Sequence, residues 1–284
     1  MLQQTQMPVV LRFYERFIDR FPTIDDLAAA SFDNVTAAWS GLGYYRRARM
    51  LREGAIAIRE RFAGSLPSDL LSLMSLPGIG RYTAGAIASI AYERHAPIVD
   101  GNIARILARL FGVKSMRTMW ERAEELVEAA RSPRVFNQAL MEIGALICRP
   151  KNPLCNQCPL RSECRAFARG RTHLAPRKRA KTRELEIALS IVTDRRGRIL
   201  MRRESGSLFD GMFVLPRGSR FALRASLVGT FRHTITNRRI TFVVYRSANG
   251  QRRTASEEWI DPRNLENTPH PAYVRKALQI AGIQ

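Results

Sequence analysis

The sequence predicts two domains of different classes, an all-α domain followed by a smaller α+β domain. From about residue 9 to residue 168, apolar side chains recur at intervals of three and four, the spacing of one face of an α-helix. After residue 184 the pattern changes to short runs rich in β-branched residues between turn-forming residues, which predicts strands. Residues 165–183 carry eight Lys or Arg and no acid, as expected of a solvated linker. We therefore place the domains at residues 1–168 and 185–284, joined by a basic linker at 169–184.

Local patterns predict the individual elements. Helices are expected where the spacing of three and four is clearest, at residues 13–21, 24–30, 35–39, 70–76 and 84–92. In the second domain, strands are expected at residues 185–193, 199–201, 213–215, 226–233 and 239–245, and a final helix at 271–281. Gly197 marks a turn at residues 194–198.

The chain of 284 residues is strongly basic, with 46 Lys and Arg against 25 Asp and Glu and a formal charge of +21. Such an excess indicates a polyanionic partner, and nucleic acid is the leading candidate. A generally basic, arginine-rich proteome is the alternative explanation. The sequence shows neither a long apolar run nor the pattern of a signal peptide, so we expect a cytoplasmic, nucleoid-associated protein without a membrane span.

The cysteines of the chain fall in one short window with the spacing C-x6-C-x2-C-x5-C, at Cys148, Cys155, Cys158 and Cys164. Four thiolates so close together can ligate one iron-sulfur cluster. A zinc knuckle, which usually shows two close cysteine pairs, and cysteines that merely share a core are the alternatives. In a reducing compartment, clustered cysteines hold metal more often than they form disulfides. We therefore expect a local, structural [4Fe-4S] cluster.

Residues 76–80, with the sequence LPGIG, lie between two helical patterns. Gly78 and Gly80 allow backbone amides to approach a phosphate at the start of the second helix. The segment looks like a helix-hairpin-helix, and a plain interhelical turn is the alternative. Twenty residues after Gly80 comes Asp100, just before a further expected helix, and the cysteine window then ends the helical domain.

This order of hairpin, aspartate and cysteines resembles the helix-hairpin-helix DNA glycosylase superfamily, which includes endonuclease III and the MutY-type adenine glycosylases. The segments LQQTQ at residues 2–6 and GLGYY at residues 41–45 resemble the MutY branch. Within the superfamily, a lysine at the position of Tyr82 marks enzymes that attack the sugar through a Schiff base. Because this chain has a tyrosine there, the resemblance implies a monofunctional glycosylase.

The resemblance also implies roles in DNA binding and base flipping. An enzyme that acts on a base in duplex DNA rotates the nucleotide out of the stack and fills the gap. Gln4 and Tyr44 would insert beside the lesion base, and Gln3 lies in the same segment. Gly78 and Gly80 would hold phosphates. A packed core aromatic is the alternative reading of Tyr44, and a solvated residue near a chain end that of Gln4.

Hydrolysis of an N-glycosidic bond builds an oxocarbenium-like sugar, which a carboxylate can stabilise while another acid protonates the departing base. Asp100 fits the first role and can also be the N-cap of the next helix. By resemblance, Tyr82 lies close to the same intermediate. The family's general acid is a glutamate two residues before the methionine that aligns with Met1. Because this chain does not contain that glutamate, the chain as written is expected to bind better than it cuts. Either the start codon is assigned too far downstream, which we favour, or the protein is a short form that has lost the acid.

The segments at residues 211–216, 229–234 and 259–271 carry a resemblance of residues 185–284 to the MutY C-terminal domain. That domain has a Nudix-like fold and reads 8-oxoguanine opposite adenine. The domain lacks the glutamate-rich, magnesium-binding helix of Nudix hydrolases, so it is expected to recognise and not to hydrolyse. The family's recognition loop reads Phe-Ser-His after a His-Thr pair, whereas this chain reads HTITN at residues 233–237. We assign lesion recognition to His233, Thr236 and Asn237, since hydroxyl and amide groups can hydrogen-bond to an oxidised guanine. A plain hairpin turn is the alternative.

The resemblance therefore implies an all-α helix-hairpin-helix glycosylase domain with a [4Fe-4S] loop, followed by a smaller α+β Nudix-like domain. The expected activity is excision of adenine mispaired with 8-oxoguanine or guanine in double-stranded DNA, during base excision repair, by a monomer. The cluster is expected to organise the basic loop around Arg149, Lys151 and Arg161. The alternatives are a non-catalytic protein that binds mismatched DNA and, less favoured, an endonuclease III-like glycosylase/lyase.

The tyrosine at position 82 generates a test between the two enzyme types. A lyase forms a Schiff base between a lysine and the sugar, and borohydride reduces it to a stable protein–DNA adduct. We expect no adduct when the chain is incubated with substrate DNA and borohydride and analysed by denaturing electrophoresis, with endonuclease III as the positive control. A trapped adduct would favour the glycosylase/lyase.

Overall fold

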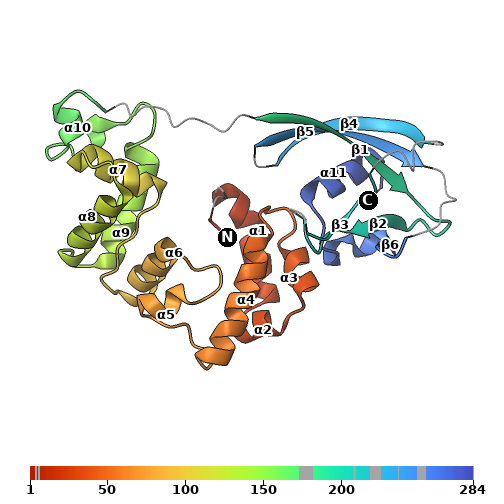
Figure 1. The fold of residues 1–284 in the computed structure, drawn as a ribbon, viewed down its shortest axis with the longest axis horizontal. Coiled ribbons are helices and arrows are strands. Elements are labelled where there is room, and N and C mark those ends of the chain that lie inside the picture. The colour runs from red at the N-terminus through yellow and green to blue at the C-terminus, as the bar shows by residue number, and fades with distance from the viewer. Residues whose placement is uncertain are drawn as a thin grey trace. The chain divides into compact units, whose positions relative to one another are not determined.

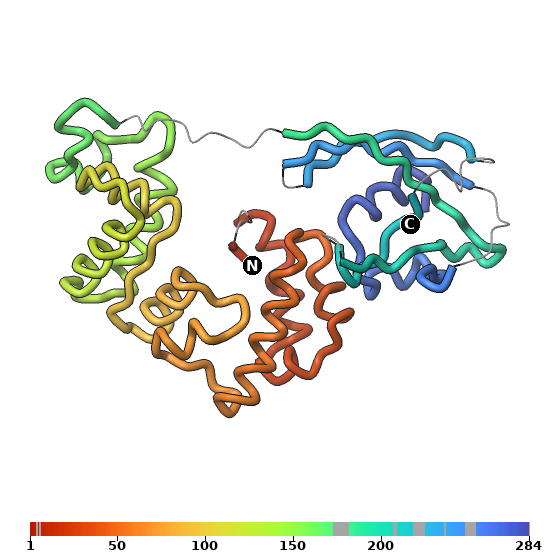
Figure 2. Tube along the Cα trace, in the orientation of Figure 1, coloured from red at the N-terminus to blue at the C-terminus, as the bar shows by residue number. Residues whose placement is uncertain are grey.

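The computed structural model describes residues 1–3, 5, 7–172, 182–206, 209–217, 225–235, 237–247 and 254–283. The chain divides into two compact units, one formed by Met1–Arg59 with Arg179–Gln284 and the other by Glu60–Lys178. Figures 1 and 2 trace helices through the first part of the chain and strands in the last part. The predicted sequence of classes, all-α and then α+β, is confirmed. The domain boundaries given above stay a prediction.

The first unit begins with a group of helices, α1 (Met7–Arg20), α2 (Ile24–Ala29), α3 (Phe32–Ala38) and α4 (Arg46–Arg61). Helix α2 starts at a capping box, because Thr23 Oγ1 accepts from the Asp26 amide at 3.1 Å and the Asp26 carboxylate accepts from the Thr23 amide at 3.2 Å. Phe17 meets Trp39 edge to face at 5.6 Å within the shared core. The clearest apolar patterns do not include α4, whose many arginines weaken its apolar periodicity.

The second unit contains α5 (Leu70–Met74), α6 (Arg81–Ala86), α7 (Gly101–Phe111), α8 (Met116–Glu128), α9 (Pro133–Glu142) and α10 (Arg165–Ala168). Helix α7 buries Ile103, Ile106, Leu107 and Leu110, an apolar face with the spacing of an amphipathic helix, in a core shared with α8 and α9. Gly112 ends α7 with a φ of 72°, a conformation that glycine adopts at little cost. Both α6 and α9 continue into a π-helical turn, at Ile87–Ala91 and Ile143–Ile147.

The strands of the first unit follow in the order β1 (Arg183–Val192), β2 (Ile199–Arg203), β3 (Phe213–Val214), β4 (Ala225–Ile235), β5 (Arg238–Ser247) and β6 (Glu257–Ile260), and helix α11 is Ala272–Ile280. They form two sheets, ordered β1-β5-β4 and β3-β2-β6. Strand β1 runs parallel to β5, while β4 and β5 form an antiparallel pair. Helix α11 buries Tyr273 and Val274 in the core that both sheets share. The predicted strands and final helix are therefore confirmed, and β6 adds a strand at residues 257–260.

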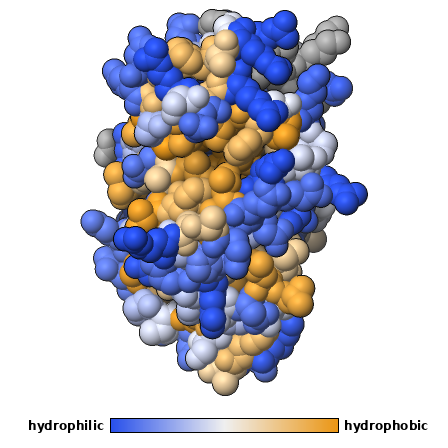
Figure 3. Space-filling model, turned by 90° about the vertical axis from the view of Figure 1, so that its left-hand side faces the viewer, coloured by the Kyte–Doolittle hydropathy of each residue, from blue (hydrophilic) through white to orange (hydrophobic). Residues whose placement is uncertain are grey.

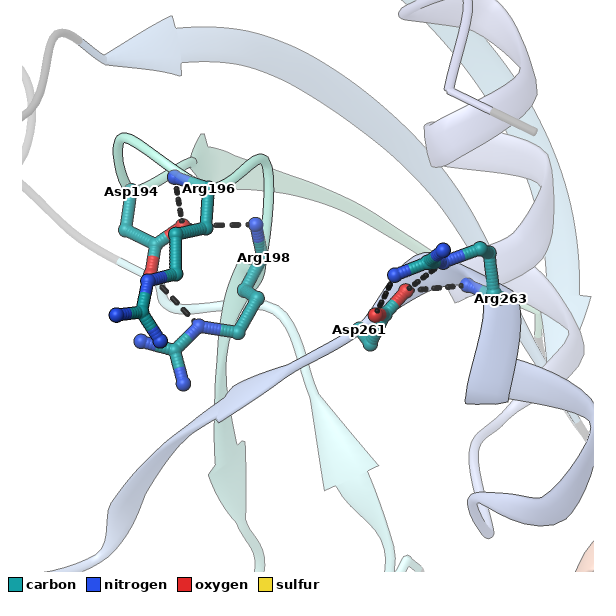
Figure 4. A network of polar contacts seen from close by, with 5 residues as sticks. All are labelled: Asp194, Arg196, Arg198, Asp261 and Arg263. Carbon is teal, nitrogen blue, oxygen red and sulfur yellow. Dashed lines mark hydrogen bonds and ion pairs between the residues drawn. The ribbon is translucent and has the colours of Figure 1, made fainter.

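Asp194 and Asp261 each bind arginines in the connections at one end of this sheet region (Figure 4). Asp194 accepts from the backbone amides of Arg196 and Arg198, at 2.9 and 2.8 Å, and from the Arg198 guanidinium at 2.7 Å. Asp261 caps the 3-10 helix Pro262–Asn267 and pairs with Arg263 at 2.8 Å, and this guanidinium lowers the pKa of the Asp261 carboxyl. The turn predicted at residues 194–198 is confirmed.

Helices from the start of the chain and strands from its end share contacts within the first unit. Met212 belongs to the same core as Trp39, and the ring of Phe32 lies where a Cβ on Gly211 would point. An ion pair joins Arg49 to Asp210 at 2.5 Å. Segments about 160 residues apart in sequence are therefore packed together.

The surface mixes charged and apolar side chains. Figure 3 shows one face of the molecule on which a hydrophobic area is bordered by hydrophilic residues. In the second unit, Leu71 is 83% exposed and Leu146 is 65% exposed. None of the helices in the described part of the chain is both long enough and apolar enough to cross a membrane.

Close packing at Gly85 generates a stability prediction. A Cβ built on Gly85 would lie 2.1 Å from the carbonyl oxygen of Pro97, so an alanine there forces backbone to move. We expect Gly85→Ala to lower the free energy of unfolding by about 1–3 kcal/mol, measured by urea denaturation. Gly101→Ala, at the first position of α7 where the new Cβ meets nothing within 4 Å, is the control and should not lower it. Equal stability of the two variants would contradict the packing argument.

Candidate functional site

The hairpin segment joins α5 to α6 through a tight turn. Gly78 has a φ of 80°, a left-handed conformation that favours glycine. The Ile79 amide donates to the Leu76 carbonyl at 3.2 Å, and Gly80 is the N-cap of α6, where it has no side chain to form a capping hydrogen bond. The first residue of α6, Arg81, lies 4.0 Å from the centroid of the Trp120 ring. The glycines therefore serve the turn itself, and phosphate binding by Gly78 and Gly80 stays a prediction.

Asp100 and Tyr82 lie close together in the second unit. The Asp100 carboxylate caps α7, accepting from the backbone amides of Asn102 at 2.9 Å and Ile103 at 2.8 Å. Burial raises the pKa of the half-buried Tyr82 phenol, and the negative charge of Asp100 raises it further. The phenol oxygen lies 3.9 Å from the sulfur of Met141. The Asp100 carboxylate, held by two backbone amides, is thus placed near the phenol of Tyr82. Position 82 carries a tyrosine and no lysine.

The cysteine side chains surround one small cavity. Its volume is about 30 Å³, and its lining includes Cys148, Cys155, Cys158 and Cys164. Burial raises the pKa of the Cys158 thiol, and the neighbouring cysteines add to this rise. Among the described residues, no group of three His, Cys, Asp or Glu side chains is arranged to hold a single metal ion.

Helix α7 is tied to the cysteine loop by two arginines. Arg105 donates to the carbonyls of Cys148 at 2.7 Å and Gly144 at 2.6 Å. Arg109, which is 3% exposed, donates to the carbonyl of Arg149 at 2.8 Å and to the sulfur of Cys148 at 3.2 Å. The helix that carries the Asp100 cap therefore also positions the first cysteine of the loop. Sequence reasoning missed both arginines, because nothing local distinguishes them from the other basic residues.

The predicted base-flipping residues of the first unit lie on two irregular segments. Tyr44 is 45% exposed and has a φ of 50°, and so it is not the packed core residue that was its alternative reading. Gln3 lies on the exposed N-terminal segment, and its carbonyl accepts from the guanidinium of Arg47. Gln4 lies outside the described residues. Arg47, which joins these segments, is a further residue that sequence reasoning missed.

The same unit contains a large cavity beside Tyr44. Its volume is about 370 Å³, and it is lined by residues 41–45, Phe209, residues 233–235 and residues 271–273. Burial lowers the pKa of the half-buried His233, and the charge of Lys276 adds to the effect. Asn237 is exposed and its carbonyl accepts from the Arg183 amide at 2.9 Å, whereas Thr236 lies outside the described residues. Of the predicted lesion-recognition residues, the structure therefore brings His233 to the cavity.

Comparison with known proteins finds one matching family model and several similar solved structures. Residues 1–131 match the model of the HhH-GPD superfamily of base excision DNA repair proteins. A thermostable thymine-DNA glycosylase has a similar structure, with a TM-score of 0.56 and 27% identity over 59% of this chain and 80% of that one. An endonuclease III–DNA complex, at 24% identity and a TM-score of 0.52, shares the fold over 60% of this chain and 80% of that one. Residues 1–131 of the helical part are therefore similar to the HhH-GPD superfamily.

Within this superfamily, the chain is similar to adenine DNA glycosylases. It is 48% identical over 177 residues to the adenine DNA glycosylase of Rattus norvegicus, a match that covers 60% of this chain and 34% of the relative. Identity to the Homo sapiens enzyme is 47% over 177 residues, covering 60% and 32%. Identity to the enzyme of Buchnera aphidicola subsp. Baizongia pistaciae is 42% over 172 residues, covering 59% and 49%. The chain thus spans about a third of the mammalian relatives and about half of the bacterial one.

Proposed function

We propose that the chain is a monofunctional DNA N-glycosylase that removes adenine mispaired with 8-oxoguanine or guanine from double-stranded DNA in base excision repair. The observation that carries the proposal is the position of the Asp100 carboxylate. It is the N-cap of α7, its charge acts on Tyr82 of α6, and both residues lie in the unit that contains the hairpin. The 48% identity to a mammalian adenine DNA glycosylase supports adenine as the base removed.

The proposed reaction is hydrolysis of the bond between the sugar and adenine. The electron pair of that bond leaves with the base, which takes up a proton. The sugar becomes an oxocarbenium-like cation, and the Asp100 carboxylate stabilises its positive charge. Water then bonds to the sugar carbon and loses a proton, which leaves an abasic site. Tyr82 has no amine that could bond to the sugar, so strand cleavage through a Schiff base is not part of the proposal.

DNA binding combines charge with insertion into the stack. The net charge of +21 gives a salt-sensitive, sequence-independent affinity for phosphates, to which Gly78 and Gly80 contribute backbone amides. Gln3, Gln4 and Tyr44 enter the duplex and fill the space left by the rotated nucleotide.

Lesion recognition is assigned to the end of strand β4 and the turn that follows it. His233 lines the cavity beside Tyr44, and Thr236 and Asn237 follow in the same segment. Imidazole, hydroxyl and amide groups supply both donors and acceptors, as reading the edge of an oxidised guanine requires. The proposed Nudix-like domain would thus supply recognition, and the helical part would supply the chemistry.

The lining of the cysteine cavity supports the [4Fe-4S] cluster that we propose for it. Cys148, Cys155, Cys158 and Cys164 would hold the cluster, since their thiols line one cavity. The buried guanidinium of Arg109, whose Nε has no hydrogen-bond partner in the described part of the chain, supplies positive charge beside the sulfurs. When bound, the cluster would join the loop through iron–thiolate bonds and so stabilise the basic segment that contains Arg161.

Asp100 provides the test of the proposed chemistry. Asparagine keeps the N-cap acceptor but removes the negative charge, whereas alanine removes both. Adenine release from an 8-oxoguanine:adenine duplex is measured under single-turnover conditions for the unchanged chain and for each variant. Asp100→Asn should lower that rate by roughly 10²–10³-fold, the usual cost of losing one electrostatic contact to a transition state.

The controls for Asp100 separate folding from catalysis. We expect Asp100→Asn to unfold at nearly the same urea concentration as the unchanged chain, and Asp100→Ala to lose about 1 kcal/mol through the missing cap. Equal release rates for Asp100→Asn and the unchanged chain would exclude the proposed role. Tight lesion binding without release by the unchanged chain would favour a mismatch-binding protein.

The cluster is tested by metal content. We expect the purified chain to contain about four iron atoms and to absorb visible light, as a [4Fe-4S] centre does. Cys158→Ser should lose both properties, because a hydroxyl is a poor ligand for this cluster. Ser162→Ala, an exposed position in the same loop, should keep them. Zinc in place of iron in the unchanged chain would show that the cysteines form a zinc site instead.

A further inference from the structure

One guanidinium joins the two segments to which base flipping is assigned. Arg47 Nη1 donates to the carbonyl of Met1 at 2.7 Å and to the carbonyl of Gln3. Arg47 Nη2 donates to Thr5 Oγ1 at 2.8 Å and to the carbonyl of Gly43 at 3.2 Å. The N-terminal segment and the turn at residues 41–45 are therefore bonded to each other through a single side chain.

The turn that Arg47 holds has an unfavourable backbone. Gly41, Gly43 and Tyr44 all have positive φ angles, of 106°, 71° and 50°. Glycine adopts this conformation readily, but a tyrosine persists in it only where its surroundings hold it. Without such support, Tyr44 would leave this conformation and its ring would point elsewhere.

Arg47 and Trp39 supply that support. The Arg47 amide donates to the Tyr44 carbonyl at 2.8 Å, and the guanidinium carbon lies 5.4 Å from the centroid of the Tyr44 ring. The same carbon lies 5.5 Å from the centroid of the Trp39 ring, which is 1% exposed and belongs to the core. The Trp39 indole donates to the Gly43 carbonyl at 3.2 Å, which anchors the turn to the core.

Arg47 is not an ordinary phosphate-binding arginine, because its contacts are with the protein itself. Its terminal nitrogens donate to protein oxygens, so little of its hydrogen-bonding capacity remains for DNA. Only a planar guanidinium can make these separate bonds while contacting two rings, because an ammonium is a compact point charge. Arg46, its neighbour in sequence, is exposed and carries the same charge.

We propose that Arg47 is a positioning residue for base flipping, which holds the segment of Gln3 and the ring of Tyr44 at a fixed spacing before DNA binds. This inference rests on the proposed function, since it assumes that these two segments enter the duplex. A preformed spacing lowers the entropic cost of inserting both segments in one step. Loss of Arg47 therefore lowers extrusion of the base and leaves attraction to phosphates almost unchanged.

The test compares Arg47→Met with Arg46→Met, which remove the same charge from neighbouring positions. The probe is a duplex with 2-aminopurine, which fluoresces when unstacked, opposite 8-oxoguanine, so extrusion is read without bond cleavage. We expect Arg47→Met to reduce the extrusion rate by roughly 10²-fold, the cost that a misplacement of about 1 Å can carry. Arg46→Met should stay within about twofold of the unchanged chain, and the salt dependence of undamaged-duplex binding by Arg47→Met should equal that of the unchanged chain. Arg47→Lys should not restore extrusion.

A second measurement tests, without DNA, whether Arg47 holds the turn at residues 41–45. Chymotrypsin cleavage after Leu42 or Tyr44 reports how often the turn opens. We expect faster cleavage in Arg47→Met than in Arg46→Met, with the circular dichroism of both unchanged. If Arg47→Met does not fold, Thr5→Val removes one of the acceptors and should slow extrusion on its own.

The outcomes separate the two claims. An unchanged chain that extrudes no 2-aminopurine would contradict the proposed function, and cleavage would still decide whether Arg47 holds the turn. The inference would be overturned if Arg47→Met extrudes the base as fast as Arg46→Met does. Where Arg47→Met does not fold, it would be overturned if Thr5→Val extrudes the base as fast as the unchanged chain does. Equal cleavage rates for Arg47→Met and Arg46→Met would overturn it as well.

Discussion

Hydrogen bonds from arginine side chains to backbone carbonyls hold the irregular parts of this protein. Loops leave carbonyl groups without partners from secondary structure, and a guanidinium offers five donors in one plane to satisfy them. Arg47 does this for the N-terminal segment and the turn around Tyr44. Arg105 and Arg109 do it for the cysteine loop. The segments assigned to function are thus ordered by charge-assisted bonds that regular helices and strands do not need.

These bonds divide the basic residues into two groups. Arginines such as Arg109 are buried and donate their hydrogen bonds to the protein itself, so they contribute little to a surface that attracts DNA. Exposed arginines such as Arg169 remain available to phosphates. The formal charge of +21 therefore overstates the charge presented to a nucleic acid. It still leaves a large excess, because only 25 acidic residues oppose the 46 basic ones.

Asp100 shows how one group can serve structure and chemistry together. As an N-cap it accepts two amide hydrogen bonds, which fix its position at the start of α7. The same fixed position places its charge near Tyr82. Because Arg105 and Arg109 project from the same helix to the cysteine loop, the carboxylate and the proposed cluster site are joined by one rigid element.

The sequence by itself determined the classes of structure and the residues of the cysteine window. Periodic apolar spacing identifies helices such as α7, and β-branched runs identify strands such as β1, since both patterns are local. The motif order around Gly80 and Asp100 likewise carries the family resemblance. Local patterns did not reveal α4, whose arginines weaken the apolar periodicity.

Only the tertiary structure decided which side chains meet. The contact of Arg47 with Gln3 joins positions 44 residues apart, and that of Arg109 with Cys148 joins positions 39 apart. The packing of Trp39 with Met212 in one core joins segments even further apart in the chain. An arginine that binds a distant carbonyl has no local pattern to distinguish it, because the partner is brought near only when the chain folds.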